Sequence, residues 1–596
     1  MSESRIVRDP VCGMPLELDK VRFKAEFGGK VYYFCSEYCK RRFFERPKIA
    51  YFSMEIGIKS EIPTYSGGLG VLAGDTIRSS ADLRIPMIAV TLVSRKGYLK
   101  QRIMEDGEQL EYPDEWDPSE YIICLPQMVE VPIEGRRVKV RAWLYEYQSV
   151  TGGVVPILFL DTDVDGNSPE DRCITDYLYG GDERYRLKQE IVLGIGGVRM
   201  LEALNIKVAK YHMNEGHSSL LTLELLRKNG MNQDEVKNLC IFTTHTPVEA
   251  AFDKFPYKLI KEVLGEDFLP LETLKKYGGQ EWLNMTLLAL NLSKYTNGVT
   301  KAHMEYSRKL FPGHHIMAIT NGVHSYTWTS PFFRKLFDKY IPGWANEPEL
   351  LVRVGVIPDD ELWEAHMKAK KHLLEFVHER AGVTMDSEIL TIGFARRATA
   401  YKRATLIFSD LNRLREVNRT GKIQMIFAGK AHPKDIPGKM IIKEICKYAK
   451  MLKDEIRIVY LENYSMDMAA KLTSGVDVWL NTPLPPLEAS GTSGMKAAHN
   501  GVLNFSVLDG WWVEGCIEGV TGWAIGPHPD EIVSGDERRR RELRDLYNKL
   551  EYLIIPTFYE RRDKWIDMMS NAIGKVAYYF NSHRMMQRYA TEAYLL

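Results

Sequence analysis

The sequence predicts an α/β protein made of two large units of alternating strands and helices, preceded by a small cysteine-containing segment. Short apolar segments rich in β-branched residues recur between longer segments of helical periodicity, which is typical of parallel sheets covered by helices. The chain has 596 residues, and a chain of this length is too long for one hydrophobic core. Three of its eight cysteines lie within the first forty residues.

The alternation and its interruptions divide the chain into five expected parts. They are a small module at residues 1–48, a first unit at 49–350, a connection at 351–387, a second unit at 388–571 and terminal helices at 572–596. The connection contains a long expected helix at residues 359–381, because spaced apolar residues follow an acidic start and Gly382 comes after them. No linker rich in glycine, serine or proline separates the module from the first unit, so we expect the module to lie against the body.

In the first unit, apolar segments mark the expected strands. They fall at residues 87–93, 155–160, 208–212, 240–244 and 316–319. Residues 138–147 predict a hairpin insertion. The glycine-rich run at 66–75 predicts a turn into a helix, where backbone can approach a bound group closely.

The second unit repeats the alternation, with strands expected near Ile389, Met425, Ile456 and Val476. Four cations, Arg396, Arg397, Lys402 and Arg403, follow the first of these strands. Ligands of such sheets bind at the carboxyl ends of strands, and clustered cations there suit two phosphate groups held close together. The alternative is a solvated helix start.

A single lysine, Lys496, follows a turn of small residues at 490–494. Three prolines in residues 481–487 end the preceding strand, and the small hydroxyls and open backbone N–H groups of the turn suit an anion at a helix start. A lysine beside such a site can form a Schiff base with pyridoxal phosphate, whose phosphate needs donors. The alternative is an ordinary Gly/Ser loop with a solvated lysine.

The segment 488–500 resembles the pyridoxal-phosphate signature of the α-glucan phosphorylases. It matches at Glu488, Ala489, Ser490, Gly491, Ser493, Met495, Lys496 and Asn500, and departs at His499, where the family usually has leucine or methionine. Residues 51–58, 186–190 and 212–219 also resemble the short, maltodextrin-type members. The resemblance runs from about Ile49 to the C-terminus.

The resemblance implies the roles of individual residues. The residues implied for the cofactor are Lys496, Thr492, Ser493, Arg396 and Tyr464. The residues implied for substrate and catalysis are Arg397 and Lys402 at the substrate phosphate, Gly68 in the loop over phosphate and sugar, His245, Asn321 and Glu488 at the glucosyl unit, and Ser490 and Gly491. Thr399 stands where many relatives have histidine, so that contact is not carried over.

The same resemblance implies a GT-B architecture, two Rossmann-like domains around a cleft, with the terminal helices crossing back onto the first domain. It implies phosphorolysis of an α-1,4-glucan or maltodextrin from its non-reducing end, with inorganic phosphate as co-substrate and α-D-glucose 1-phosphate as product. The cofactor phosphate is then expected to exchange a proton with the substrate phosphate. We also expect a homo-oligomer.

Two rival functions are compatible with the same chain. The first is a nucleotide-sugar glycosyltransferase of the same architecture, which would need no cofactor lysine. The second is a glucan-binding protein that has lost catalysis and senses metal or redox state through its N-terminal cysteines. A visible-ultraviolet spectrum and a phosphorolysis assay discriminate among these functions.

Cys12, Cys35 and Cys39 predict a metal site in the N-terminal module. Crowded cysteines in a reducing compartment favour metal over disulfide, and thiolates suit zinc or copper(I). Cys35 and Cys39 are expected to share a helix face. Residues 9–47 resemble the YHS/TRASH-type metal-associated module, and the alternative is a tiny domain whose cysteines merely pack.

The overall charge excludes some classes of partner. Lysine plus arginine equals aspartate plus glutamate at 79 each, so no net field attracts nucleic acid or an anionic membrane. No segment reaches the roughly 18 to 20 apolar residues that span a bilayer, and the N-terminus is charged rather than signal-like. We therefore expect a cytoplasmic protein.

Overall fold

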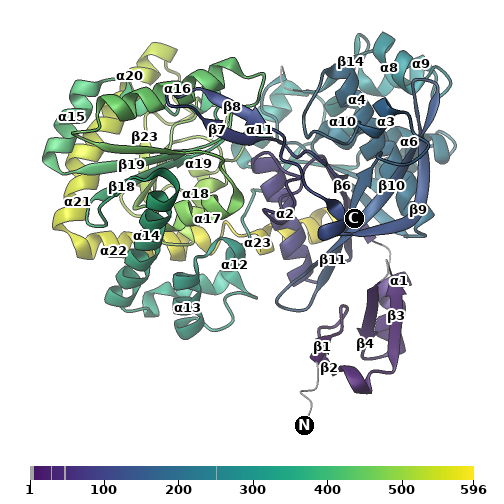
Figure 1. Ribbon diagram of the computed structural model, residues 1–596, viewed down its shortest axis with the longest axis horizontal. Coiled ribbons are helices and arrows are strands. Elements are labelled where there is room, and N and C mark those ends of the chain that lie inside the picture. Colours follow the sequence, from purple (N-terminus) through teal and green to yellow (C-terminus); the bar gives the residue numbers. More distant parts are fainter. Residues whose placement is uncertain (1–5, 28–29, 46–47, 250–251, 596) are drawn as a thin grey trace.

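The computed structural model describes residues 6–27, 30–45, 48–249 and 252–595 (Figure 1). Two large sheets, each covered by helices, lie side by side, and the small N-terminal module projects below the first of them. The mixed α/β class expected from the sequence is confirmed. The predicted junction at Pro47 lies outside the described residues.

The first sheet has nine strands and is mostly parallel. In spatial order they are β17 (Met317–Ala318), β16 (Tyr295–Gly298), β13 (Cys240–Thr243), β12 (Val208–Asn214), β5 (Lys48–Ser53), β6 (Met87–Leu92), β11 (Val154–Asp161), β10 (Arg136–Gln148) and β9 (Ile123–Ile133). Strands β17 to β11 run parallel, whereas β10 and β9 are antiparallel to their neighbours. The hairpin predicted at residues 138–147 is wrong in its bounds, because these residues belong to the single strand β10. The hairpin of this antiparallel edge is formed by β9 and β10, with its turn at Glu134 and Gly135.

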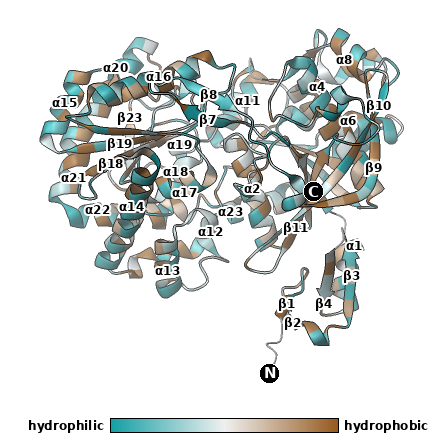
Figure 2. Cartoon of the chain, viewed as in Figure 1, coloured by the Kyte–Doolittle hydropathy of each residue, from teal (hydrophilic) through white to brown (hydrophobic). Residues whose placement is uncertain are grey.

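The second sheet is entirely parallel, and its strands are apolar in Figure 2. In order they are β20 (Arg457–Leu461), β19 (Ile423–Ala428), β18 (Leu390–Ala395), β21 (Val478–Asn481), β22 (Leu503–Val507) and β23 (Gly522–Ile525). The strand expected near Val476 starts two residues later than predicted. Helix α17 (Met466–Gly475) ends directly before Val476, so the chain needs that residue and Asp477 to turn into the sheet.

Helices cover both sheets. In the first half they are α2 (Gly68–Asp82), α4 (Glu183–Ile191), α5 (Gly197–Ala203), α6 (Leu220–Lys228), α7 (Gln233–Leu239), α8 (Tyr257–Leu264), α9 (Leu271–Gly278), α10 (Met285–Asn291), α11 (Lys301–Leu310) and α13 (Pro331–Tyr340). In the second half they are α15 (Leu411–Thr420), α16 (Ile436–Met451), α17, α18 (Ser493–Ala498), α20 (Gly535–Lys549), α21 (Ile555–Glu560), α22 (Arg562–Asn571) and α23 (Ser582–Tyr589).

The long helix predicted at 359–381 is confirmed as α14 (Asp359–Ala381). Three acidic residues occupy its first turn, where they complement the helix dipole. Gly382 follows it in the left-handed conformation, with φ of 66°. Glycine adopts this conformation without the steric cost that a side chain brings, which explains why the helix stops there.

A buried charge network fixes α14 to the second sheet. Lys370 Nζ donates to Asp477 Oδ2 at 2.6 Å, and His366 Nε2 lies 2.7 Å from Asp477 Oδ1. The backbone N–H of Thr391 also donates to Asp477, at 2.7 Å. Burial alone would raise the pKa of Asp477, but the Lys370 ammonium and His366 outweigh it and lower that pKa. The carboxylate therefore stays ionised and paired.

The C-terminal segment lies against the first half of the chain. Met585 and Met586 of α23 join the same buried cluster as Ile49 and Tyr51 of β5. Ser582 Oγ hydrogen-bonds Ser79 Oγ of α2 at 2.5 Å. Helix α23 is therefore part of the hydrophobic core of the first half.

A second link crosses in the opposite direction. The hairpin of β7 (Lys100–Ile103) and β8 (Gln109–Tyr112) leaves the first half and lies over the second, beside α16 (Figure 1). Gln101 Nε2 donates to the carbonyl of Gly429 at 2.8 Å, and Gln109 Nε2 donates to that of Ala431 at 2.9 Å. The two halves are thus held together on both sides of the space between the sheets.

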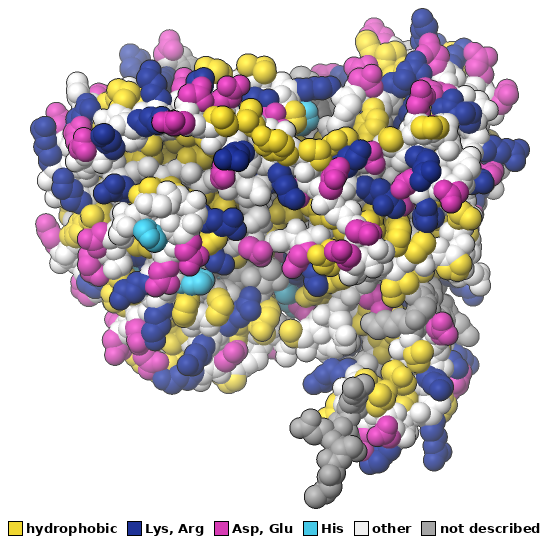
Figure 3. Space-filling view, in the orientation of Figure 1, with side chains coloured by type: hydrophobic (Ala, Val, Ile, Leu, Met, Phe, Trp, Pro, Cys, Tyr) yellow, Lys and Arg dark blue, Asp and Glu magenta, His cyan; other side chains and the backbone are white. Residues whose placement is uncertain are grey.

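Charged side chains of both signs are interspersed over the visible surface (Figure 3). This distribution agrees with equal numbers of acidic and basic residues. None of the helices in the described ranges has the length and apolar character needed to cross a bilayer.

Candidate active site

A cavity of about 960 Å³ lies between the two halves. It is lined by every residue that the sequence predicts for substrate, catalysis and cofactor. These residues are Gly68, His245, Asn321, Arg396, Arg397, Lys402, Tyr464, Glu488, Ser490, Gly491, Thr492, Ser493 and Lys496. The structure therefore brings together side chains that are up to 428 positions apart, from Gly68 to Lys496.

Lys496 lies in the last turn of the short helix α18, and its side chain is buried. Its Nζ is 3.8 Å from the centre of the Trp328 ring, and the indole Nε1 of Trp328 donates to Asp75 Oδ2 at 2.8 Å. Burial lowers the pKa of Lys496 to about 8. A fraction of the amine is therefore neutral near neutral pH, which is the form that attacks an aldehyde.

Glu488 lies among the cations that follow β18. Its Oε2 accepts from Arg396 Nη2 and from Lys402 Nζ, both at 2.6 Å. Burial raises the pKa of Glu488, but Arg396 and Lys402 outweigh it and bring that pKa to about 2. The Nη1 of Arg396 and the Oγ of Ser490 are buried without a hydrogen-bond partner among the described residues. This cluster therefore keeps donors that a bound anion can use.

The expected cluster of four cations is wrong in one member. Arg403 has a positive φ of 49°, and its guanidinium points to Glu542 Oε2, at 2.6 Å, and to the carbonyl of Pro483, at 2.7 Å. Glu542, a buried residue of α20, thus pairs with Arg403 and holds its side chain away from the cavity. Arg396, Arg397 and Lys402 line the cavity without it, and Thr399 lies beside them with its hydroxyl buried and unpartnered within the described part of the chain.

The opposite wall offers neutral hydrogen-bonding groups. His245 follows β13, and its Nε2 lies 2.6 Å from Asn214 Oδ1. Burial lowers the pKa of His245 to about 3, so the imidazole is neutral. Asn321 follows β17, and its Oδ1 is buried without a hydrogen-bond partner among the described residues. Neutral donors and acceptors of this kind suit sugar hydroxyls.

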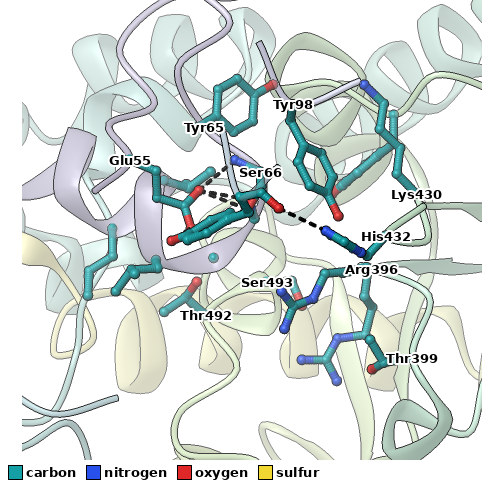
Figure 4. Close-up of a pocket in the computed structure, with 18 of the residues that line it drawn as sticks. Glu55, Tyr65, Ser66, Tyr98, Arg396, Thr399, Lys430, His432, Thr492 and Ser493 are labelled. Carbon is teal, nitrogen blue, oxygen red and sulfur yellow. Dashed lines mark hydrogen bonds between the residues drawn. The ribbon is translucent and has the colours of Figure 1, made fainter. Parts of the chain in front are cut away.

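Glu55 is a structural partner of the site that sequence reasoning missed. It follows β5, and its carboxylate accepts from the backbone N–H groups of Ser66, at 2.5 Å, and Gly67, at 3.2 Å. Figure 4 shows Glu55 and Ser66 on the opposite side of the cavity from Arg396. Tyr179 OH donates to the other oxygen of Glu55 at 3.0 Å. A Cβ on Gly70 would lie 2.6 Å from Glu55 Oε2, so this glycine is needed for the close approach. The available signal was an acid directly after a buried strand.

Asp509 was missed as well. It follows β22, and its Oδ2 accepts from the backbone N–H of Glu488 at 2.9 Å. Burial raises the pKa of Asp509 to about 7. Asp509 thus supports Glu488 from behind the cavity wall, whereas Lys430 and His432, which follow β19, line the cavity itself (Figure 4). Each of these residues comes just after a strand of the parallel sheet, which is the signal that was available.

The N-terminal module contains a second cluster of candidate ligands. Cys35 Sγ lies 3.5 Å from Cys12 Sγ and 3.6 Å from Cys39 Sγ. Asp9, which is buried, completes a set whose ligand atoms all lie within 4.8 Å of one another. Backbone N–H groups of Cys35 and Val11 donate to the Asp9 carboxylate, both at 2.7 Å.

The expectation that Cys35 and Cys39 share a helix face is wrong. Helix α1 (Glu37–Glu45) begins after Cys35, which instead follows strand β4 (Lys30–Phe34) at the end of a hairpin with β3 (Phe23–Phe27). The hairpin end and the first turn of the helix still bring the two sulfur atoms together. Asp9 could not be chosen from the sequence, because its place depends on the turn that Gly13 closes by donating to the Asp9 carbonyl at 2.8 Å.

Comparisons with known proteins agree with this geometry. A family model described as "Carbohydrate phosphorylase" matches residues 271–521. The maltodextrin phosphorylase of Thermococcus litoralis is 43% identical over 92% of this chain and 71% of the relative, and the glycogen phosphorylase of Aquifex aeolicus is 38% identical over 92% and 86%. The glycogen phosphorylase of Mycobacterium tuberculosis is 36% identical over 92% and 70%.

The chain belongs to the carbohydrate phosphorylase family. A second family model, described as "YHS domain", matches residues 7–51. This member of the carbohydrate phosphorylase family therefore carries a YHS domain in front of the body.

The departure at His499 is accommodated in the phosphorylase core. The ring is fully buried behind Lys496, and its Nε2 lies 2.9 Å from Ser325 Oγ while its Nδ1 lies 2.7 Å from the Met495 carbonyl. Burial lowers the pKa of His499 to about 4, so the ring is neutral. Both ring nitrogens are satisfied, which removes the main cost of a buried polar side chain.

Proposed function

We propose that the chain is an α-1,4-glucan phosphorylase that releases α-D-glucose 1-phosphate, with retention, from the non-reducing end of a maltodextrin or glycogen chain. The observation that supports this proposal most is the single cavity in which the buried amine of Lys496 lies with Arg396, Arg397 and Lys402. The printed names of the relatives, maltodextrin phosphorylase and glycogen phosphorylase, support the same substrate class.

We assign the two halves to a GT-B architecture of two Rossmann-like domains around a cleft. The proposed boundaries are residues 49–350, 351–387, 388–571 and 572–596. Two observations support this assignment: the mostly parallel first sheet and fully parallel second sheet, and the position of the cavity beside loops that follow their strands. Ligands of such sheets bind at the carboxyl ends of the strands. A homo-oligomer and a cytoplasmic location are proposed from family resemblance, and sedimentation and cell fractionation test them.

The residues present fit pyridoxal phosphate. Burial lowers the pKa of the Lys496 amine to about 8. Arg396 Nη1 and Ser490 Oγ are buried without a hydrogen-bond partner among the described residues, so both can donate to a bound phosphate. Lys496 would hold the aldehyde end, Arg396, Thr492 and Ser493 would hold the phosphate, and Tyr464 would line the remaining wall. When bound, the cofactor supplies a phosphate group with a second pKa near 6, suited to proton exchange near neutral pH.

The chain's own residues prepare the remaining substrates. Arg397 and Lys402 bind and orient the inorganic phosphate, and their charges offset repulsion between two phosphate groups held close together. Neutral His245 and the amide of Asn321 orient the terminal glucosyl unit. The glycine loop that Glu55 holds in place covers one side of the cavity and helps to exclude water.

A phosphorolysis assay tests the proposal. Purified protein with maltodextrin and inorganic phosphate is expected to release α-D-glucose 1-phosphate, and its spectrum should show bound pyridoxal phosphate. Transfer from a nucleotide sugar without cofactor absorbance would favour the glycosyltransferase alternative. Glucan binding with no turnover in either assay would favour the silent sensor.

The Glu488→Gln variant is expected to separate phosphate binding from turnover. Removal of the carboxylate leaves Arg396 and Lys402 without their anionic partner, so inorganic phosphate should bind more tightly in calorimetry. Phosphorolysis should fall by about 10²-fold or more, because a preorganised polar contact to the sugar is lost. Glu272→Gln, an exposed position on α9, is the matched control. Unchanged phosphate affinity and unchanged turnover would contradict the proposed place of Glu488.

We also propose that Cys12, Cys35 and Cys39, with Asp9 as fourth ligand, bind a divalent soft or borderline metal such as zinc. Three sulfur atoms and one carboxylate within 4.8 Å form a donor set that suits tetrahedral zinc. Cys12→Ser is expected to abolish tight Zn²⁺ binding, whereas phosphorolysis should survive chelation because the cluster lies outside the cavity. Loss of turnover on chelation, restored by metal, would contradict this peripheral role.

A further inference from the structure

The N-terminal module touches the body through two arginines that meet at Gly13. Arg84, two residues after α2, places its guanidinium directly against the Gly13 backbone, where a Cβ would lie 2.0 Å from Arg84 Nη2. The same Nη2 donates to the carbonyl of Thr151 at 2.8 Å. Gly13 is buried and immediately follows the ligand Cys12. A residue of the body thus packs on the metal-binding turn itself.

The second arginine belongs to the module. Arg8 Nη1 donates to the Gly13 carbonyl at 3.1 Å, and its aliphatic stem packs on Gly152 of the body, where a Cβ would lie 2.8 Å from Arg8 Cδ. The turn is closed internally by Gly13 N–H, which donates to the Asp9 carbonyl, and by Asp9 N–H, which donates to the Met14 carbonyl at 3.0 Å. The ligand turn is therefore held from both sides.

Among the residues that the structure describes, neither arginine has a counter-ion. Within the described ranges, no carboxylate lies within the 4.0 Å ion-pair distance of Arg8 or Arg84. The Nε of Arg84 is buried and has no hydrogen-bond partner among the same residues. Arg8 is exposed, whereas Arg84 is partly buried. For Arg84, the lack of an anion costs free energy that a nearby negative charge would recover.

A loaded metal site would supply that charge. Three thiolates and one carboxylate carry four negative charges, so a divalent ion leaves a net charge of −2 on the site. Arg8 and Arg84 together carry +2. This charge of +2 matches the net charge of −2 on the loaded site.

We propose that Arg84 is an outer partner of the module's metal site, so that metal binding and docking of the module on the body strengthen each other. This inference rests on the proposed metal site. By linkage, if the docked arginine raises metal affinity, the metal must tighten docking by the same factor. Metal binding therefore stabilises the contact between the module and the body.

Zinc titration of the full chain against a chromophoric chelator tests the proposal. Arg84→Met keeps the length of the side chain but removes its charge, and it should bind Zn²⁺ about tenfold to a hundredfold more weakly, which is the usual effect of losing an outer partner. Arg84→Lys should restore most of the affinity, because a cation remains at that position. Arg137→Met, an exposed arginine on β10 away from the module, is the matched control and should bind as the natural chain does.

Hydrogen exchange gives a second readout that does not depend on affinity. Zn²⁺ should slow amide exchange in residues 8–14 and 149–153 of the natural chain, and the Arg84→Met variant should lose this protection at 149–153. If the natural chain binds no Zn²⁺, the metal site itself is refuted. If it binds Zn²⁺ and Cys12→Ser does not, but Arg84→Met binds and exchanges like the natural chain, only the coupling is refuted. A failure of Arg84→Lys to recover affinity would also overturn the role of charge.

Discussion

The Lys496→Ala variant is expected to lose bound cofactor and phosphorolysis together. Its amine is buried and lines the cavity that also holds Arg396 and Lys402, whereas the amine of Lys402 is already paired with Glu488 Oε2 at 2.6 Å. Without Lys496 the site would not hold the cofactor whose phosphate group is proposed to supply general acid–base chemistry. Turnover should then fall by at least about 10²- to 10⁴-fold, the usual contribution of general acid catalysis. Absorbance of the purified protein and release of glucose 1-phosphate measure the two losses.

Lys447→Ala is the matched control for this variant. Lys447 is exposed on α16 and away from the cavity, so its loss should leave the spectrum and the rate unchanged. Melting curves of both variants separate loss of cofactor from loss of fold. A Lys496→Ala protein that keeps its cofactor absorbance and turns over at the natural rate would refute the proposed site.

The second large effect is expected in stability, at the network that joins α14 to the second sheet. Asp477→Leu leaves the ammonium of Lys370 fully buried without its counter-ion. The free energy of unfolding should fall by roughly 3–5 kcal/mol, which is typical when one member of a buried ion pair is removed. The melting temperature and the midpoint of the first urea transition measure this change.

The pH dependence of the same network has a definite sign. The pKa of Asp477 is lowered on folding, so its contribution is present above the ordinary aspartate pKa and is lost as the pH falls toward the folded value. The Asp477→Leu variant should therefore differ from the natural chain less at acid pH than at pH 7.

Two controls sharpen this prediction. Lys368→Met breaks an exposed pair with Glu364 on the same helix, where the nitrogen–oxygen distance is 2.7 Å, and should change stability by less than about 1 kcal/mol. The double variant Lys370→Met with Asp477→Leu should recover much of the loss, because no unpaired charge then stays buried. Equal effects of Asp477→Leu and Lys368→Met would mean that burial does not set the energy of the pair.

The sequence predicted correctly those helices and strands whose first and last residues are marked by neighbouring residues. Helix α14 was predicted at both ends, because its acidic first turn and Gly382 are local signals. Strand β21 was placed two residues early, because Gly475 and Val476 have the composition of a buried strand while α17 still occupies the first of them. Only the packing of α17 on the sheet decides whether Gly475 belongs to the helix or to the strand.

The candidate site divides in the same way. Residues within a motif, such as Lys496 and Arg397, were predicted because their neighbours in sequence mark them. Arg403 was placed wrongly because its partner Glu542 comes from a helix 139 positions away. Glu55 and Asp9 act through contacts that exist only after the chain has folded. A motif predicts what a residue can do, whereas the fold decides which partner it meets.

The hairpin of β7 and β8 carries a consequence for dissection of the enzyme. Its amides belong to the first half by sequence, but they satisfy carbonyls of Gly429 and Ala431 in the second. If the gene were cut within the connection, the first fragment would carry the β7–β8 hairpin without the surface on which it packs. The second fragment would carry the Gly429 and Ala431 carbonyls without their hydrogen-bond donors. The two fragments should therefore be insoluble when made separately and regain solubility only when produced together.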